Sequence, residues 1–132
     1  MVRRFWESVW TAGNAAELHE LLGSAFRENG EPVDVGAFAQ AIVRWRQTFP
    51  DFSATVEELF EVAPGRVVSR VTYRGTQHRS WAGLPSKGRS FEGVGIDLFT
   101  IVDGRISELW HAADHYDMAV QLGGRLAAAD DE

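Results

Sequence analysis

The sequence predicts an α+β fold, in which helices come first and an antiparallel sheet follows. Apolar residues recur at helical spacing up to about residue 49, and beyond it they alternate with polar residues as in strands. An Asp-Gly pair at 103–104 separates two alternating runs, which is the strongest short-range sequence signal for a β-hairpin. Helices that precede a run of antiparallel strands are expected to pack on one face of the sheet.

Three helices are expected in the first part of the chain, at residues 2–12, 14–22 and 35–49, with a loop over 23–34. Gly13 ends the first helix. Asn14 is placed as the N-cap of the second, and Glu17 completes a capping box three residues later. Asp34 is placed as the N-cap of the third helix. That helix ends before Pro50, because proline disfavours a helical residue in front of it.

Four strands are expected in the second part, at residues 53–62, 66–79, 90–102 and 105–114. Pro64-Gly65 turns the first strand into the second, and Asp103-Gly104 turns the third into the fourth. The segment from Trp81 to Arg89 contains two glycines and a proline, so we expect a loop there. A C-terminal helix over about 115–127 follows, and the tail from about residue 128 is expected to fray.

The Asp-Gly turn allows the facing residues of the last hairpin to be predicted. A two-residue turn pairs Asp97 with Trp110, and nearer to the turn it pairs Phe99 with Glu108. Strand side chains alternate between the two faces, so Trp110 lies on the same face as Asp114. This aromatic and acidic face is expected to line a pocket.

The opposite face of the hairpin is also too apolar to lie in water. It is expected to carry Val94, Ile96, Leu98 and Leu109, and no other predicted element of the chain is left to cover it. Large exposed apolar patches mark interaction sites. We therefore expect a homo-oligomer, either a dimer or a tetramer, built through this outer face.

The composition excludes several classes of function. At 132 residues, the chain is expected to form a single domain over 1–132. The formal net charge of −6 argues against nucleic-acid binding, which usually needs a basic surface. There is no cysteine, and no apolar run approaches the roughly 18 to 20 residues of a membrane helix. We therefore expect a cytoplasmic protein with no nucleic-acid and no membrane partner.

Asp114 is the leading candidate for chemistry. It comes at the end of a strand and at the mouth of an apolar surface, which suits proton transfer by a carboxylate. The same junction between strand and helix is also the usual place of an N-cap. Tyr73 is expected to face inward, either as a phenolic donor to a substrate oxygen or as a packing residue. Asp97 is expected either to contact a ligand or to accept from the Trp110 indole.

No metal or cofactor is expected. His111 and Asp114 are metal-ligand types, but strand alternation directs them to opposite faces, and no third ligand completes a site with His115. Nucleophilic catalysis is not expected either, because the chain has no cysteine and no Gly-x-Ser-x-Gly elbow. A lone acid in a pocket is the remaining catalytic pattern.

An ordered set of short motifs resembles a known family. In chain order, these motifs are Phe49-Pro50-Asp51-Phe52, Gly75-Thr76-Gln77-His78, Gly83-Leu84-Pro85-Ser86-Lys87-Gly88, Asp103-Gly104-Arg105-Ile106 with Glu108, Trp110 and Asp114, and Gln121-Leu122-Gly123. Over nearly the whole chain they resemble the SnoaL-like polyketide cyclases, also called ester cyclases. That family shares the cone-shaped fold of nuclear transport factor, ketosteroid isomerase and scytalone dehydratase.

The resemblance implies a curved sheet around a cone-shaped pocket that the N-terminal helices close, with oligomers formed through the outer sheet face. It also implies a cofactor-independent, metal-free reaction, the intramolecular aldol closure of a polyketide ring. The family's acid–base aspartate falls at Asp114. Ala112 stands where the cyclases carry a histidine, so the polar partner of the acid is missing at that position.

We therefore expect an enzyme in which Asp114 takes a proton from an activated carbon of an apolar, polyketide-like substrate. The residues expected to bind and orient that substrate are Trp110, Asp97, Phe99 and Tyr73. One alternative is an isomerase or hydrolase of a small apolar compound in the same pocket. Another is a ligand-binding or interaction module without chemistry. A closed apolar cavity with Asp114 in its wall favours an enzyme, whereas a filled core favours the module.

Overall fold

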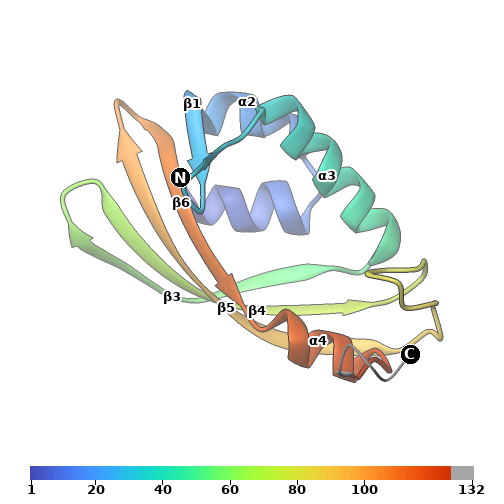
Figure 1. Cartoon of the computed structure of the whole chain (residues 1–132). Coiled ribbons are helices and arrows are strands. Elements are labelled where there is room, and N and C mark those ends of the chain that lie inside the picture. Colours follow the sequence, from blue (N-terminus) through green and yellow to red (C-terminus); the bar gives the residue numbers. More distant parts are fainter. Residues whose placement is uncertain (126–132) are drawn as a thin grey trace.

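The computed structural model describes residues 1–125 and shows a curved six-stranded sheet with helices on its concave side (Figure 1). This confirms the α+β fold with a curved sheet that the sequence and the family resemblance predict. The C-terminal helix α4 spans His115–Gln121, shorter than the predicted 115–127. Residues 126 and 127, and the tail expected to fray from residue 128, lie outside the described residues.

The N-terminal part of the chain is helical, as its apolar spacing predicts. Its elements are α1 (Val2–Arg4), the π-helical η1 (Phe5–Thr11), the short η2 (Ala15–Glu17), α2 (Leu18–Leu21) and α3 (Val35–Thr48). Gly13 adopts a φ of +83° after η1, where a side chain would be strained, and so ends the first helical segment. The Asp34 side chain accepts from the Ala37 N–H at 2.9 Å and is therefore the predicted N-cap of α3.

The sheet has the strand order β2-β1-β6-β5-β4-β3. Its strands are β1 (Leu22–Glu28), β2 (Glu31–Pro32), β3 (Ser53–Ala63), β4 (Arg66–Thr76), β5 (Ser90–Val102) and β6 (Arg105–Ala113). All neighbouring strands pair antiparallel except β1 and β6, which pair parallel. Among residues 1–125, no helix has the length and apolar character needed to cross a membrane.

The loop predicted over 23–34 is wrong, because most of this segment forms β1 and β2. Leu22 and Phe26 of β1 are buried against the core, and their even spacing puts both side chains on one face. The strand adds to the free edge of β6, with Leu22 opposite Ile106. This extra strand extends the concave face and brings Glu28 to the pocket.

The predicted register of the β5–β6 hairpin is also wrong, because β6 contains a β-bulge at Ser107. Ile101 pairs with Ile106 as expected, but Thr100 then pairs with Glu108, which leaves Ser107 as the extra residue. One inserted residue exchanges the two faces of the strand for every position beyond it. Asp97 consequently lies opposite His111 and not opposite Trp110.

The bulge reverses which side chains of β6 face inward. Leu109, expected on the outer face, is 2% exposed and belongs to the core. Trp110, expected in the pocket, is 47% exposed on the outer face, and its indole N–H donates to Glu108. Ile96 of β5 is 55% exposed and remains an outer-face residue as predicted.

The core lies between the concave face of the sheet and the N-terminal helices. Phe5 of η1 packs edge-to-face on Phe99 of β5, with ring centroids 5.4 Å apart. Trp6 donates its indole N–H to the buried Ser69 hydroxyl of β4 at 3.1 Å. These contacts hold η1 across the sheet and leave the space beside it open for a cavity.

Candidate active site

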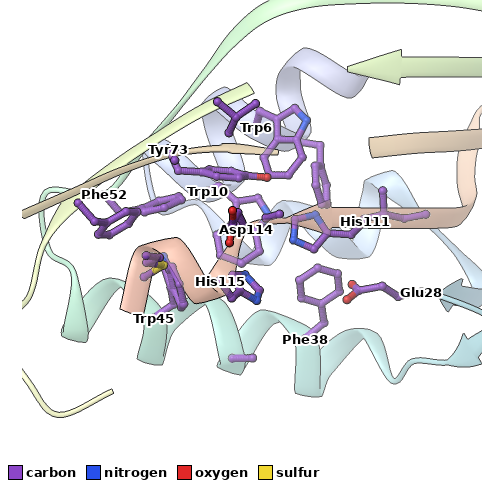
Figure 2. A pocket seen from close by; sticks show the side chains of 18 of the residues that line it. Trp6, Trp10, Glu28, Phe38, Trp45, Phe52, Tyr73, His111, Asp114 and His115 are labelled. Atoms are coloured by element: carbon purple, nitrogen blue, oxygen red, sulfur yellow. The ribbon is translucent and has the colours of Figure 1, made fainter. Parts of the chain in front are cut away.

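A cavity of about 390 Å³ lies between the concave face of the sheet and the helices η1 and α3. Its wall is mainly aromatic, formed by Phe5, Trp6, Trp10, Phe38, Trp45, Phe52, Tyr73 and Phe91 (Figure 2). Ligand pockets of this size are usually apolar with a few well-placed polar groups. The cavity therefore suits an aromatic or otherwise apolar small molecule.

Four ionisable side chains interrupt this apolar wall. Glu28 comes from the end of β1, His111 from β6, Asp114 from the β6–α4 junction, and His115 from the start of α4. Figure 2 shows Asp114 and the two imidazoles gathered together, with Glu28 beyond His111. The centroids of the two imidazole rings are 6.1 Å apart. Acids and bases thus share one region of an otherwise apolar cavity.

His111 is held by the buried carboxylate of Asp97, which lies directly opposite it on β5. Asp97 is 1% exposed, and its Oδ1 is hydrogen-bonded to His111 Nδ1. Burial raises the pKa of Asp97 above its usual value, although the bond to His111 opposes that rise. Burial lowers the pKa of His111, but the hydrogen bond and charge of Asp97 outweigh burial, so its pKa is raised.

Tyr73 lies beside this pair, with its hydroxyl close to the Asp97 carboxylate. Within residues 1–125, neither the Tyr73 hydroxyl nor Oδ2 of Asp97 has a hydrogen-bond partner at bonding geometry. Burial, and then the neighbouring Asp97 charge, raise the pKa of Tyr73, so the phenol stays protonated. A Cβ at Gly95 would lie 2.3 Å from the Tyr73 hydroxyl oxygen, so glycine at this position makes room for the phenol.

Asp114 both caps α4 and lines the cavity. Its Oδ1 accepts the Asp117 N–H at 2.8 Å, which is N-cap geometry. The carboxylate lies between Tyr73 and His115 in Figure 2. Because one oxygen is sufficient for the cap, the other remains for a ligand.

The pKa values of the other two ionisable groups, Glu28 and His115, are shifted by burial and by neighbouring charges. Burial raises the pKa of Glu28, with the His111 charge opposing the rise and Asp97 adding to it. Burial and the His111 charge lower the pKa of His115, so this imidazole is neutral near pH 7. Nowhere in residues 1–125 do three His, Asp or Glu side chains gather closely enough to hold a metal ion.

Comparison with known proteins identifies the family. The family model described as SnoaL-like polyketide cyclase matches residues 1–122. The chain belongs to this family. It is 33% identical over 129 residues to the aklanonic acid methyl ester cyclase DauD of Streptomyces sp. (strain C5). The match covers 93% of this chain and 80% of DauD.

Solved structures agree with this SnoaL-like assignment. TsrD from Streptomyces laurentii superposes with a TM-score of 0.82 at 29% identity, over 92% of this chain and 91% of TsrD. IdmH, a putative polyketide cyclase from Streptomyces antibioticus, superposes with a TM-score of 0.80 at 27% identity. That match covers 93% of this chain and 96% of IdmH.

The SnoaL-like fold does not bring all five predicted site residues together. Asp114 and Tyr73 line the cavity, and Asp97 reaches it only through His111. Phe99 is fully buried beneath the wall, packed against Phe5 and Trp6. Trp110 is on the outer face of the sheet, so the prediction that it shapes the pocket is wrong in position.

Three acidic or imidazole residues of the cavity, Glu28, His111 and His115, were not predicted to line it. His111 was directed outward by regular alternation, yet the sequence holds a signal of the bulge. Ile106 and Leu109 are both apolar and three residues apart, a spacing that a regular strand would place on opposite faces. For Glu28 the missed signal is the Asn29-Gly30 pair that follows it, which forms the turn of the β1–β2 hairpin.

Proposed function

We propose that this protein closes a ring of a polyketide-like substrate by an intramolecular aldol reaction, with Asp114 as the general acid–base. The observation that carries the proposal is the Asp114 carboxylate in the wall of a 390 Å³ aromatic cavity. Membership of the SnoaL-like cyclases and the similarity to DauD, named as an aklanonic acid methyl ester cyclase, support the same reaction class. The site itself, and not the fold, carries the chemistry.

The reaction can be written with this chain's own groups. Asp114 takes a proton from a carbon activated by neighbouring carbonyls, and the resulting enolate attacks a ketone of the same molecule. One C–C bond forms, and the alkoxide takes up a proton, so the product has the mass of the substrate. There is no net oxidation, so the step needs no redox cofactor, and in this proposal Asp114 removes the proton without a metal.

The aromatic wall supplies binding and folding of the substrate. Trp10, Trp45 and Phe52 present flat apolar surfaces that can stack on a polycyclic substrate. Holding the two reacting carbons in contact converts an improbable loop closure into a favoured one. The Tyr73 ring adds to this wall, and its buried phenol lies on the Asp97 side of the site.

The test compares Asp114→Asn with wild type on aklanonic acid methyl ester as the probe substrate. We expect the wild type to give a product of unchanged mass and new chromatographic retention, and the variant to be about 10²-fold slower. Its melting temperature should stay unchanged, because Asn caps helices about as well as Asp. Asp117→Asn is the matched control, because Asp117 lies in the first turn of α4, the helix that Asp114 caps, but does not line the cavity.

The alternatives give different products in the same assay. A hydrolase adds one water to the substrate mass. An isomerase keeps the mass and every ketone, whereas aldol closure converts one ketone into an alcohol, which carbon-13 spectra of the product show. A binding module returns the probe unchanged after saturable binding. An Asp114→Asn variant with full activity would leave Asp114 as a cap only.

The proposal extends to the assembly, in which the outer sheet face joins copies of the chain. Ile96, Leu98 and Trp110 lie together there, along a shallow groove that Val68 and Ala112 also line. None of these side chains contributes to the aromatic cavity. A homodimer through this face would cover apolar surface while leaving the concave side free for substrate.

A further inference from the structure

His111 presents one ring nitrogen to the cavity while its other nitrogen is bound behind it. Nδ1 is engaged by the buried Asp97 carboxylate, and this leaves Nε2 as the nitrogen available to a ligand. The bulge at Ser107 turns the ring inward, and the register places Asp97 straight across from it. A buried carboxylate behind an imidazole fixes both the orientation and the tautomer of the ring.

The surroundings of His111 favour its protonated form. The ionisable side chains of the site that lie around the ring are Asp97 on β5, Glu28 on β1, Tyr73 on β4, and Asp114 and His115 at the start of α4. The charges of Asp97 and Glu28 both favour a proton on His111, while Tyr73 stays neutral. The charge of His111 in turn disfavours a proton on His115. Of the two imidazoles, only His111 has a carboxylate on its rear nitrogen.

We propose that His111 is a second catalytic residue, whose Nε2–H donates to the ketone oxygen that the enolate attacks, and that Asp97 is its positioning residue. This inference rests on the proposed aldol function and adds the electrophilic half of the reaction. Asp114 acts on the carbon that loses a proton, whereas His111 acts on the oxygen that gains one.

The proton balance closes over one turnover. Asp114 gains the C–H proton as the enolate forms, and His111 delivers its Nε2 proton to the new alkoxide as the C–C bond forms. The protonated Asp114 then returns a proton to the neutral His111, directly or through water. Both residues recover their starting states, and the substrate has only moved a proton from carbon to oxygen.

The division of labour predicts that the two half-reactions can be separated. In D₂O, exchange of deuterium into the activated carbon of aklanonic acid methyl ester reports proton removal, and ring closure reports the complete reaction. His111→Gln should slow ring closure about 10²-fold while largely retaining deuterium exchange. Asp114→Asn should lose both. His19→Gln is the matched control, since His19 is an exposed histidine far from the cavity and should change neither.

The pH profile tests the role of Asp97. If His111 reacts as the imidazolium, kcat/KM falls as the pH rises through its folded pKa. Asp97→Asn should move that fall to lower pH, because it removes the charge behind the ring, and a merely structural role would not move it.

A spectroscopic measurement tests the inference without turnover, in case the His111 variant folds poorly or the protein does not convert the probe substrate. Nitrogen-15 spectra of wild-type protein should show His111 titrating above its ordinary pKa of 6.5. The same resonance should titrate lower in Asp97→Asn. Ring closure at the wild-type rate in His111→Gln, or a His111 that titrates at or below 6.5 in wild-type protein, would overturn the inference. Neither result bears on the role of Asp114. That role would be contradicted only if Asp114→Asn kept wild-type rates of deuterium exchange and ring closure.

Discussion

At the scale of single residues, the Asp97–His111 pair makes the stability of the protein depend on pH. Asp97 is buried and its pKa is raised by that burial, with the bond to His111 opposing the rise. Burial lowers the pKa of His111, but the bond to Asp97 and the charges of Asp97 and Glu28 together outweigh burial and raise the pKa above the ordinary 6.5. In both groups the folded state binds a proton more tightly than the unfolded chain does. Stability contributed by the pair therefore falls as the pH rises.

The free energy of unfolding is therefore predicted to decrease with rising pH. His111 stabilises the fold fully below its unfolded pKa of 6.5, and this contribution is lost as the pH rises through the higher folded value. The free energy of unfolding, measured by urea denaturation between about pH 6 and 9, should fall more steeply with pH for wild type than for an Asp97→Asn/His111→Gln double variant. A difference between the two proteins that stays constant or grows with pH would contradict this.

At the scale of elements, β5 shapes the cavity through two glycines on its inner face. Gly93 lines the cavity, and a Cβ there would meet nothing within 4 Å. Gly95 follows two residues later on the same face, and the Tyr73 ring occupies the space that a side chain at this position would need. The two glycines have different roles, since one leaves space for a ligand and the other receives a side chain of the protein.

Alanine at these two positions should therefore have unequal effects on stability. Gly95→Ala places a Cβ 2.3 Å from the Tyr73 hydroxyl oxygen and should destabilise the protein by roughly 1 to 3 kcal/mol, the usual range for overpacking. Gly93→Ala, the matched control on the same strand, should change the free energy of unfolding little. Chemical denaturation of both variants measures the contrast, and equal effects would show that Tyr73 is free to move.

The same element scale explains what the sequence could predict about the site. Tyr73 was placed correctly because β4 pairs with β5 without a register shift, so alternation holds along the strand. Asp114 reaches the cavity although the register was wrong, because a residue at a strand-to-helix junction enters from the end of the strand. Trp110 and His111 were exchanged, because one bulge at Ser107 inverts every face beyond it.

Parts of the site depend on contacts that no local pattern carries. Glu28 lines the cavity only because β1 adds, in parallel, to β6, and the paired residues are more than eighty positions apart in the chain, as in Glu28 and Leu109. Asn29-Gly30 indicates a hairpin beside Glu28, but a parallel partner has no connecting turn, so no local pattern indicates the pairing with β6. The buried Asp97–His111 bond likewise follows from the register of a hairpin that the alternation alone did not determine.

At the scale of the whole molecule, the two faces of the sheet serve different purposes. Helices cover the concave face, as Figure 1 shows, and the cavity lies between them and the sheet. The outer face leaves Ile96 55% and Trp110 47% exposed, with Leu98 beside them. No helix within residues 1–125 covers that face, so a second copy of the chain is the partner that we propose for it.

The last prediction tests this assembly. Ile96→Arg places a charge at the centre of the proposed interface and should convert a dimer into monomers, because a buried unpaired charge is costly. Light scattering on the size-exclusion peak at micromolar concentration measures the mass of wild type and variant. Val43→Arg is the matched control: Val43 is 48% exposed on α3, away from the sheet face, and its replacement should leave the dimer intact. Wild-type protein that stays monomeric at micromolar concentration would remove the outer face as an interface, and a monomeric Val43→Arg would move the interface to the helices. In the Ile96→Arg monomer the cavity is built from one chain alone, so deuterium exchange at the activated carbon of the probe substrate should persist.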